Sequence, residues 1–207
     1  MNVKKYYKQV MIALGCGLLF CGLLAVDLGS KALAEWYHEA HGLAQSEYFL
    51  GFIRLTYAQN YDVAYGIIGQ IFEDPAQQEI AMQFVLYGTV VLVLLIAAMF
   101  FTIFRKNLPV RICLAVVEAG ALGNMIDRFV LGYVRDFIDV RPIGFNICNI
   151  ADIFITGGIV AVLVCVLFIG KDAVFPASQK WREEAKREDA AREARERAKK
   201  DAAEHHD

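Results

Sequence analysis

The sequence predicts an all-α membrane protein with four transmembrane helices, a small extracytoplasmic β-cradle and a short surface helix. Two observations support this fold class. Hydrophobic residues make up 57% of the 207 residues, which exceeds the usual share in a soluble domain. They are gathered into four apolar stretches of about 17 to 25 residues, long enough to cross the hydrocarbon core of a bilayer. The stretches are residues 10–26, 80–104, 110–126 and 150–170.

The charges that flank these stretches predict how the chain crosses the bilayer. Four crossings place both termini on the same side. Lysine and arginine gather before the first stretch, between the second and third, and after the fourth, so the positive-inside bias makes these segments cytoplasmic. Residues 27–79 carry eight acids against two bases and are expected to face outward. The first apolar run continues past Cys16 and three more follow, so we expect an uncleaved anchor rather than a signal peptide or lipidation site.

The outward segments contain a helix pattern and two strand patterns. Residues 33–41 are expected to form the short surface helix. Residues 49–59 and 134–140 are rich in aromatic and β-branched residues, as is typical of strands. We therefore place the β-cradle at about residues 42–66 and 133–148.

The chain divides into a four-helix transmembrane domain, residues 1–170, and a charged cytoplasmic tail, residues 171–207. The tail contains pairs of glutamate and arginine at i,i+4 spacing, among them Glu183 with Arg187. Because it is polar on all sides, it is most simply a solvated helix.

Composition argues against several classes of site. The net charge is only −2, and the basic residues lie at chain ends and helix flanks, so no nucleic-acid partner is expected. Of the five cysteines, four lie inside apolar stretches and none forms a CxxC pair, which argues against a disulfide framework or a zinc site. The four histidines are explained by an exposed helix and a frayed tail. We expect no metal and no cofactor.

In the second predicted strand an acid stands on an apolar face. The period-two alternation of a strand places Asp136 on the same side as Val134. Asp139 alternates to the other side with two arginines, Arg135 and Arg141, where a solvent-side ion pair explains it. Asp136 is therefore the first candidate for a functional carboxyl.

The second candidate is Asp152, at the start of the last apolar stretch. Asn149 precedes it as a good N-cap, and an acid three residues later bonds back to the amide of the cap and complements the positive helix end. Capping and catalysis both explain Asp152, since a carboxylate held by a cap is also a positioned carboxylate.

Two further polar groups lie near the outer ends of the first and third stretches. Asn124, Asp127 and Arg128 share one helical face at i, i+3 and i+4. Polar groups at this depth need partners, so an ion pair between Asp127 and Arg128, or bonds to adjacent loops, is favoured over direct catalysis. Asp27 and Lys31 stand at i,i+4, where a surface ion pair explains them.

Two neighbouring carboxyls can perform hydrolysis. At a partly desolvated interface their titrations are coupled, so one is favoured as the acid and the other as the base. Hydrolysis of a peptide bond by water needs such a pair, because an ionised aspartate takes a proton from water while its protonated partner supports the carbonyl oxygen. The sequence has no GxSxG, HExxH or P-loop motif that would indicate another chemistry.

Five motifs occur together in a recognisable order. They are DLGSK at residues 27–31, NYDVAYG at 60–66, GALGNMIDR at 120–128, GYVRDFID at 132–139 and NIAD at 149–152. Over about residues 10–170 the chain resembles the lipoprotein signal peptidases, also called signal peptidase II. The resemblance implies a multi-pass aspartyl endopeptidase of the bacterial cytoplasmic (inner) membrane, without metal, with its active site toward the extracytoplasmic face. Such an enzyme cleaves diacylglyceryl-modified prolipoproteins immediately before the lipidated cysteine.

The resemblance also implies roles and partners. It makes Asp136 and Asp152 the catalytic pair. The residues that it assigns to substrate binding or to support of the pair are Asn60, Asn124, Arg128, Asn149, Asp27, Lys31 and Asp127. The expected partners are lipidated prolipoproteins, membrane lipids and globomycin-type inhibitors, and the protein is expected to be a monomer.

Three residues depart from the family's pattern. Asp62 stands where the family usually has glycine, and Cys148 stands where an aromatic residue often precedes the final asparagine. Arg135 replaces an apolar residue before Asp136, where it would either lower the pKa of that carboxyl or pair with Asp139.

A small membrane transporter or proton-conducting protein is the alternative function. In that hypothesis Glu118, Asp127 and Asp152 form a proton relay. A relay requires polar residues through the full thickness of the bundle, whereas here they gather at one end.

Overall fold

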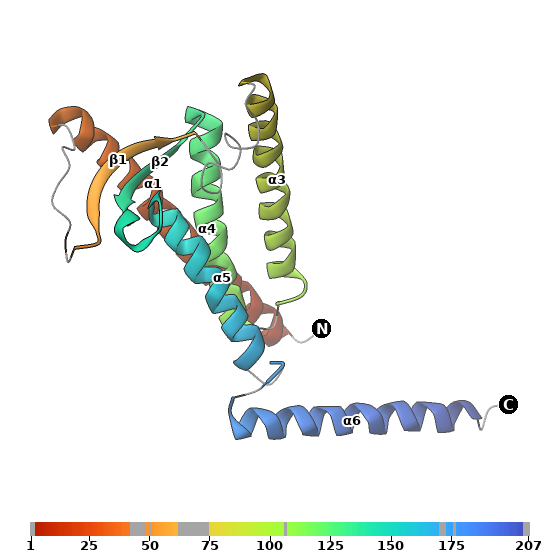
Figure 1. The fold of residues 1–207 in the computed structure, drawn as a ribbon. Helices are drawn as coiled ribbons and strands as arrows, with labels where there is room; N and C mark the ends of the chain where they lie inside the picture. The colour runs from red at the N-terminus through yellow and green to blue at the C-terminus, as the bar shows by residue number, and fades with distance from the viewer. Residues whose placement is uncertain are drawn as a thin grey trace. The chain divides into compact units, whose positions relative to one another are not determined.

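The computed structural model of the protein describes residues 3–41, 49, 51–61, 75–105, 107–169, 173–175 and 177–204 (Figure 1). Contacts divide the chain into two units, Met1–Ile159 and Val160–Asp207. In the first unit the described elements are α1 (Val3–His41), β1 (Arg54–Asn60), α3 (Pro75–Phe101), α4 (Leu108–Leu131), β2 (Val134–Asp139), the 3-10 helix η1 (Arg141–Ile143), β3 (Ile147–Cys148) and the first part of α5 (Ile150–Phe168). The second unit holds the rest of α5 and α6 (Gln179–Glu204).

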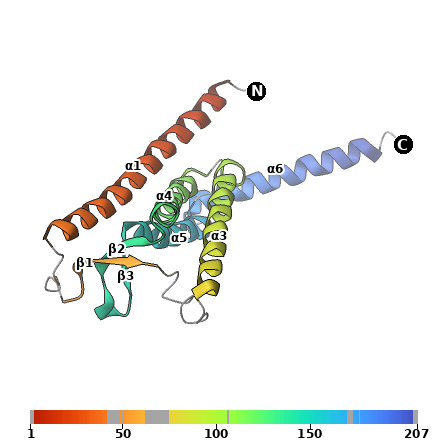
Figure 2. The ribbon, with the colours of Figure 1, turned by 90° about the horizontal axis from the view of Figure 1, so that it is seen from above.

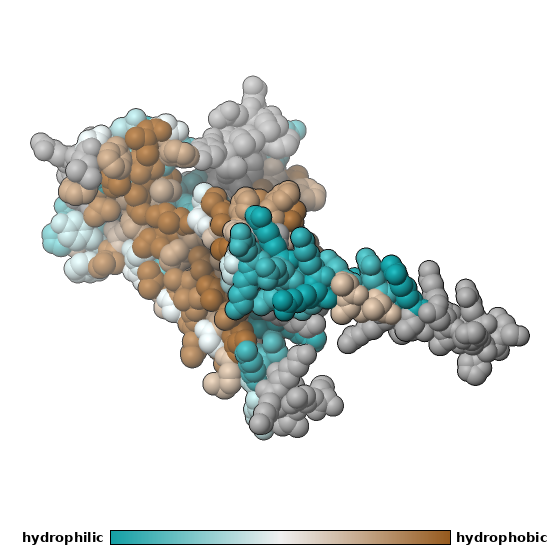
Figure 3. All heavy atoms as spheres, turned by 90° about the horizontal axis from the view of Figure 1, so that it is seen from below, coloured by the Kyte–Doolittle hydropathy of each residue, from teal (hydrophilic) through white to brown (hydrophobic). Residues whose placement is uncertain are grey.

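Four of the described helices, α1, α3, α4 and α5, are long and apolar enough to cross a membrane, as predicted. The central one is α4, which lies between α1 and α3 (Figure 2). In the most apolar 18-residue stretch of α4, 56% of the residues are buried, against 6% in α1, 6% in α3 and 17% in α5. The other helices therefore present apolar side chains outward, among them Leu18, Phe84 and Leu163. Figure 3 shows hydrophobic residues, in brown, over a large part of the face that it draws, which suits contact with lipid.

The first helix is longer than predicted. α1 continues without a break to His41, so the prediction of a separate surface helix at residues 33–41 is wrong. Its 39 residues reach about 58 Å at 1.5 Å per residue, nearly twice the thickness of a hydrocarbon core. The reason is local: no proline interrupts the segment, and Asp27 pairs with Lys31 one turn later. The added turns bring His38 onto Tyr57 of β1, with stacked rings 4.8 Å apart.

The end of α4 directs the chain into the sheet. Gly132 follows the helix with φ of 81°, and its N–H donates to the carbonyl of Arg128. Glycine favours this left-handed conformation because a side chain would be strained there. The turn leaves only Tyr133 between this glycine and β2, so Asp136 lies close to the end of the central helix.

The three strands form one antiparallel sheet in the order β1-β2-β3. In the pairing of β1 with β2, Ala58 lies opposite Asp136 and Asn60 lies opposite Val134. This register matters because it places the Asn60 side chain beside that of Asp136.

The strand predictions are confirmed with different bounds. β2 ends at Asp139, one residue before the end of the predicted segment 134–140. β1 begins at Arg54 rather than at residue 49. Phe49 forms only an isolated bridge with Ile53. β3 was not predicted, because a strand of two residues shows no alternation. Residues 42–48, 50 and 62–74 of the outward segments lie outside the described residues.

The charged tail is helical, as expected. α6 contains an ion pair between Arg197 and Glu193 with an N–O distance of 3.8 Å, and both side chains are largely exposed. An exposed pair of this kind contributes little to stability, about 0–1 kcal/mol.

Candidate active site

The ammonium group of Lys31 joins α1 to α4. Its Nζ donates to Asp27 Oδ2 and to Asn124 Oδ1, both at 2.8 Å, and lies 3.8 Å from Asp127 Oδ2. The side chains of Lys31 and both aspartates have no exposed surface. The predicted pair of Asp27 and Lys31 therefore exists, but it is buried and not on the surface. The close approach of the two helices has removed it from solvent.

Two asparagine side chains extend this network to the candidate carboxyls. Asn124 Nδ2 donates to Asp152 Oδ1 at 2.9 Å, and Asn124 Oδ1 accepts from Lys31 and from Asn149 Nδ2, the latter at 3.1 Å. Asn149 Nδ2 also donates to Asp136 Oδ1 at 2.7 Å. In both asparagines the side-chain oxygen accepts from N–H groups and the side-chain nitrogen donates to a carboxylate, which defines the orientation of each side-chain amide.

Asp152 forms the predicted capping box with Asn149. The backbone N–H of Asn149 donates to Asp152 Oδ2, and the backbone N–H of Asp152 donates to Asn149 Oδ1, both at 3.1 Å. The box determines where α5 begins and holds the carboxyl of Asp152 at the helix end. Its second oxygen, Oδ1, points to Asn124 instead.

Asp136 is buried, with 2% of its surface exposed. Asn60 Nδ2 donates to its Oδ2 at 2.8 Å, and Asn149 donates to its Oδ1. Burial raises the pKa of Asp136 to about 6, and the negative charge of Asp152 adds to the rise, while the two hydrogen bonds and the charge of Lys31 oppose it. Asn149 donates to both carboxyls, so the structure brings the two predicted candidates together.

Asp139 is not on a solvent-side face, contrary to the prediction. It has 0% exposure and accepts from Arg54 Nε at 2.7 Å and from Arg141 Nη2 at 2.8 Å. The prediction failed because the side chains of Arg54, its partner across the β1–β2 pairing, and of Arg141 from η1 both bind its carboxylate. Its pairing with Arg141 is confirmed, whereas Arg135 lies elsewhere.

Arg135 pairs with two acids on different helices. Its Nη2 donates to Asp127 Oδ1 at 2.7 Å, and its Nη1 donates to Glu35 Oε2 at 2.9 Å. Of the two alternatives predicted for Asp127, the pair with Arg128 does not form, and the carboxylate instead bonds to the segment that follows α4. The pair of Arg135 with Asp139, one of the two alternatives for Arg135, does not form either. The turn after α4 brings β2 back along the helix, so Asp127 meets a residue eight positions later instead of its neighbour.

The guanidinium of Arg128 feels three negative charges, and its Nε has no hydrogen-bond partner among the described residues. The negative charges of Asp152, Asp136 and Asp127 act on its guanidinium. Among the described residues, no group accepts a hydrogen bond from the buried Nε. A buried donor without an acceptor is unusual in a folded protein. This donor is therefore open to a group that enters the site.

Comparison with known proteins gives the site a family. The family model described as signal peptidase (SPase) II matches residues 19–168. The chain belongs to the signal peptidase II family. Lipoprotein signal peptidases of Caldicellulosiruptor bescii and Francisella tularensis subsp. novicida are 34% and 31% identical to it, over 60% and 72% of this chain and 74% and 89% of the relatives. A bacterial membrane enzyme solved by the in meso method at 2.3 Å resolution superposes with a TM-score of 0.60 at 27% identity, covering 74% of this chain and 87% of that chain.

As a member of this family, the protein is a bacterial membrane protein and a protease. The matched residues 19–168 include every member of the polar network described above. The charged helix α6 lies outside the match. The predicted resemblance is confirmed at the level of the family, and the roles of single residues stay predictions.

Of the three departures from the family pattern, Asp62 lies outside the described residues. Cys148, on β3, lies near both candidate carboxyls. Burial raises the pKa of its thiol to about 11, and the negative charges of Asp152 and Asp136 add to the rise. The thiol is therefore protonated at neutral pH and is a poor nucleophile.

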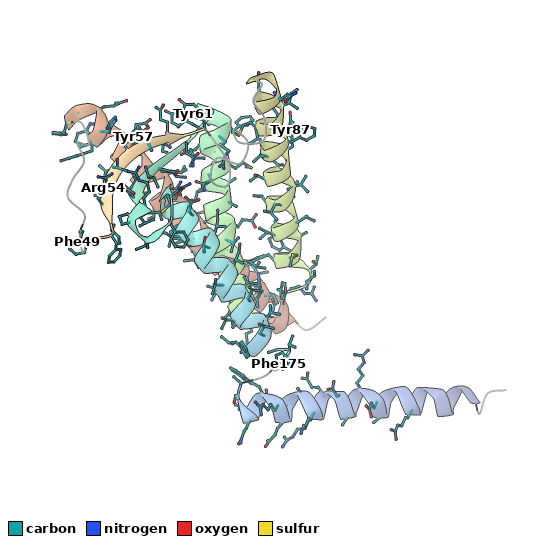
Figure 4. The ribbon with its side chains drawn as sticks, in the orientation of Figure 1. Phe49, Arg54, Tyr57, Tyr61, Tyr87 and Phe175 are labelled. Carbon is teal, nitrogen blue, oxygen red and sulfur yellow. The ribbon has the colours of Figure 1, made fainter. Side chains whose placement is uncertain are left out.

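Glu35 is the member of the network that the sequence analysis missed. Its Oε1 accepts from Tyr57 at 2.9 Å and from Tyr133 at 3.3 Å, in addition to its pair with Arg135. Tyr57 lies on β1 (Figure 4). Glu35 continues the i,i+4 spacing of Asp27 and Lys31, so a continuous first helix would have indicated it.

One cavity is lined by members of this network, and a second lies apart from it. A polar cavity of about 410 Å³ is lined by Glu35, His38, Glu39, Tyr57, Gln59 and Tyr133. An apolar cavity of about 280 Å³ lies among α1, α3 and α4, and Glu118 lines it together with residues such as Phe100 and Leu114. Glu118 is therefore separate from the carboxyls of the candidate site.

Gly123→Ala is expected to destabilise the peptidase. A methyl group at this position of α4 would overlap the carboxylate of Asp27, which would have to move away from Lys31. Overpacking of this kind costs about 1–3 kcal/mol, measurable as a lower unfolding temperature in detergent. Gly22→Ala is the matched control, because a methyl group there meets nothing within 4 Å and alanine favours helix. A Gly123→Ala protein as stable as the wild type would contradict this packing.

Proposed function

We propose that this peptidase is an aspartyl endopeptidase that cleaves the signal peptide from diacylglyceryl-modified prolipoproteins immediately before the lipidated cysteine. Membership of the family and the names of its relatives, lipoprotein signal peptidases, support the substrate class. In this proposal Asp136 and Asp152 activate the water that hydrolyses the bond.

The observation that supports the catalytic pair most strongly is the position of Asn149. Its side chain donates to Asp136 and its backbone N–H donates to Asp152. A single residue therefore donates hydrogen bonds to two carboxyls, one on β2 and one on α5. Two carboxyls so placed influence each other's ionisation, as the charge of Asp152 does for Asp136.

The two aspartates take different roles. Asp136, with a pKa raised to about 6, is the protonated partner and donates a hydrogen bond to the carbonyl oxygen of the scissile bond. Asp152, ionised, takes a proton from water, and the resulting hydroxide attacks the carbonyl carbon. As the carbon–nitrogen bond breaks, the proton on Asp152 passes to the leaving nitrogen.

The other polar residues hold the substrate or the pair. The Nε of Arg128, which has no acceptor in the part of the chain that the structure describes, suits a carbonyl oxygen of the bound peptide. Asn60, Asn124 and Asn149 orient the carboxyls through the bonds given above. The ammonium of Lys31, paired with Asp27 and Asp127, donates to Asn124 and so holds that asparagine in place.

The site is proposed to lie at the extracytoplasmic face, with both termini in the cytoplasm. Residues 1–170 would form the peptidase domain and residues 171–207 the cytoplasmic tail. In this arrangement the acyl chains of the substrate and its apolar signal segment lie in lipid and hold the scissile bond at the depth of the carboxyls. We further propose that the enzyme acts as a monomer and that globomycin-type inhibitors occupy the same site.

The proposal is tested by incubating the purified protein with a lipidated precursor and following its conversion to a shorter form on a gel. We expect conversion that globomycin blocks, and none with the same precursor lacking the lipid. Failure of the folded protein to convert the lipidated precursor would overturn the proposal.

The pH profile is expected to report the acid role of Asp136. Since this carboxyl must be protonated, kcat should fall as pH rises through about 6. Asn60 favours the ionised form by donating to it, so Asn60→Leu raises the pKa of Asp136 and moves the fall in kcat to higher pH. Gln59→Leu, on the exposed side of the same strand, is the control and should leave the profile in place. A shift to lower pH in Asn60→Leu would contradict the acid role.

A further inference from the structure

Arg135 connects the strand that carries Asp136 to two helices. Its backbone N–H and its Nε donate to Asp127 Oδ2 at 3.1 and 3.2 Å, and its Nη2 donates to Asp127 Oδ1. Nη1 reaches Glu35 on α1. One residue therefore forms three hydrogen bonds to α4 and one to α1.

These bonds are well shielded from solvent. The side chain of Arg135 is 12% exposed, that of Asp127 is fully buried and that of Glu35 is 26% exposed. A planar guanidinium that grips a carboxylate with two nitrogens fixes direction as well as distance. Tyr57 and Tyr133 hold the other oxygen of Glu35, so this acid is itself anchored.

We propose that Arg135 is a positioning residue, which fixes β2 against α4 and α1 and thereby holds Asp136 within reach of Asn149 and Asp152. The inference rests on the proposed function, in which Asp136 acts on the substrate. Successive side chains of a strand point to opposite faces. Arg135 therefore acts on Asp136 through the backbone and does not touch the reacting atoms.

The effect on catalysis follows from geometry. The charged or titratable groups that act on Asp136 come from the elements packed around it, namely Lys31 of α1, Arg128 of α4, Asp152 of α5 and Cys148 of β3. The guanidinium of Arg135 bonds to Asp127 and Glu35, and its charge is not among the causes of the raised pKa of Asp136. A displacement of about 1 Å between reacting groups can lower a rate by about 10²-fold.

The test measures kcat, KM and the pH profile with a lipidated precursor. For Arg135→Leu we expect kcat to fall about 10- to 100-fold with KM within about twofold, because the substrate contacts themselves remain. The fall in kcat with pH should also move to lower pH, because a looser strand admits water to Asp136 and burial is the main cause of its raised pKa. Arg135→Lys should have a higher kcat than Arg135→Leu but a lower one than the wild type, since lysine retains the charge but cannot bind a carboxylate through two nitrogens.

Two further variants separate positioning from stability. Glu35→Gln retains the grip of Arg135 on Asp127 and should give a smaller change in kcat and pH profile in the same direction, even if Arg135→Leu does not fold. Arg141→Leu is the matched control. It too removes an arginine that grips a buried aspartate of the same strand, Asp139, so it should lower the unfolding temperature without moving kcat per folded enzyme or the pH profile.

The outcomes are distinct. Wild-type kcat and pH profile in folded Arg135→Lys and Glu35→Gln would overturn the positioning role and leave the proposed function intact. Equal changes in kcat per folded enzyme in the Arg135 variants and in Arg141→Leu would also overturn it, because the effect would then be general loosening of the sheet. A folded wild type that leaves the lipidated precursor uncut would overturn the proposed function, and the positioning role with it.

Discussion

Asp136→Asn and Asp152→Asn are each expected to abolish the conversion of a lipidated precursor to its shorter form, while the protein still inserts into the membrane. An amide in place of Asp152 cannot take a proton from water, and an amide in place of Asp136 is a weaker donor to the carbonyl oxygen. Loss of a general acid or base lowers a rate by about 10²–10⁴-fold. The measurement is the fraction of precursor converted on a gel over time.

Glu118→Gln is the matched control for this prediction. It makes the same chemical change in a carboxyl of α4 that lines the apolar cavity and not the candidate site, so processing should continue at about the wild-type rate. Loss of processing in Glu118→Gln would show that removal of a carboxyl outside the candidate site is enough to stop the reaction, and the aspartate variants would then not identify the catalytic pair. Full processing by either aspartate variant alone would remove that residue from the catalytic pair.

Lys31→Met is expected to be the most damaging change to stability. The ammonium of Lys31 has no exposed surface and holds Asp27 and Asn124 at 2.8 Å. Its removal leaves the carboxylate of Asp27 buried with only the N–H of Ala151 as a remaining donor among the described residues. Breaking a buried pair from one side costs about 3–5 kcal/mol, which thermal or denaturant unfolding in detergent would measure.

The double variant Asp27→Asn/Lys31→Met distinguishes an ion pair from general packing. Without a charge at either position, the buried carboxylate that Lys31→Met leaves unpaired is gone, so the double variant should be more stable than Lys31→Met alone. If the two changes instead add, the energy lies in side-chain packing and not in the pair. The same measurement on Asp27→Asn alone completes the cycle.

Hydrogen bonds within one turn could be predicted from the sequence. The capping box of Asn149 and Asp152 and the pair of Asp27 and Lys31 each join residues three or four positions apart, where helix geometry alone sets the distance. The pairs that do not form, Asp127 with Arg128 and Arg135 with Asp139, depend on which element packs against which side chain. Alternation along β2 identified the two faces correctly, but it could not indicate that both are covered.

The amino-acid sequence by itself determined that four helices are long and apolar enough to cross the membrane and that Asp136 and Asp152 are the carboxyls to examine, because apolar length and residue spacing along a helix or strand are local properties. Only the tertiary structure decided that Asn149 donates to both carboxyls, that Lys31 is buried between α1 and α4, and that Arg135 binds Glu35 one hundred residues earlier. Those contacts form where helices and sheet pack together, and residue spacing along the chain does not indicate which distant residues will meet there.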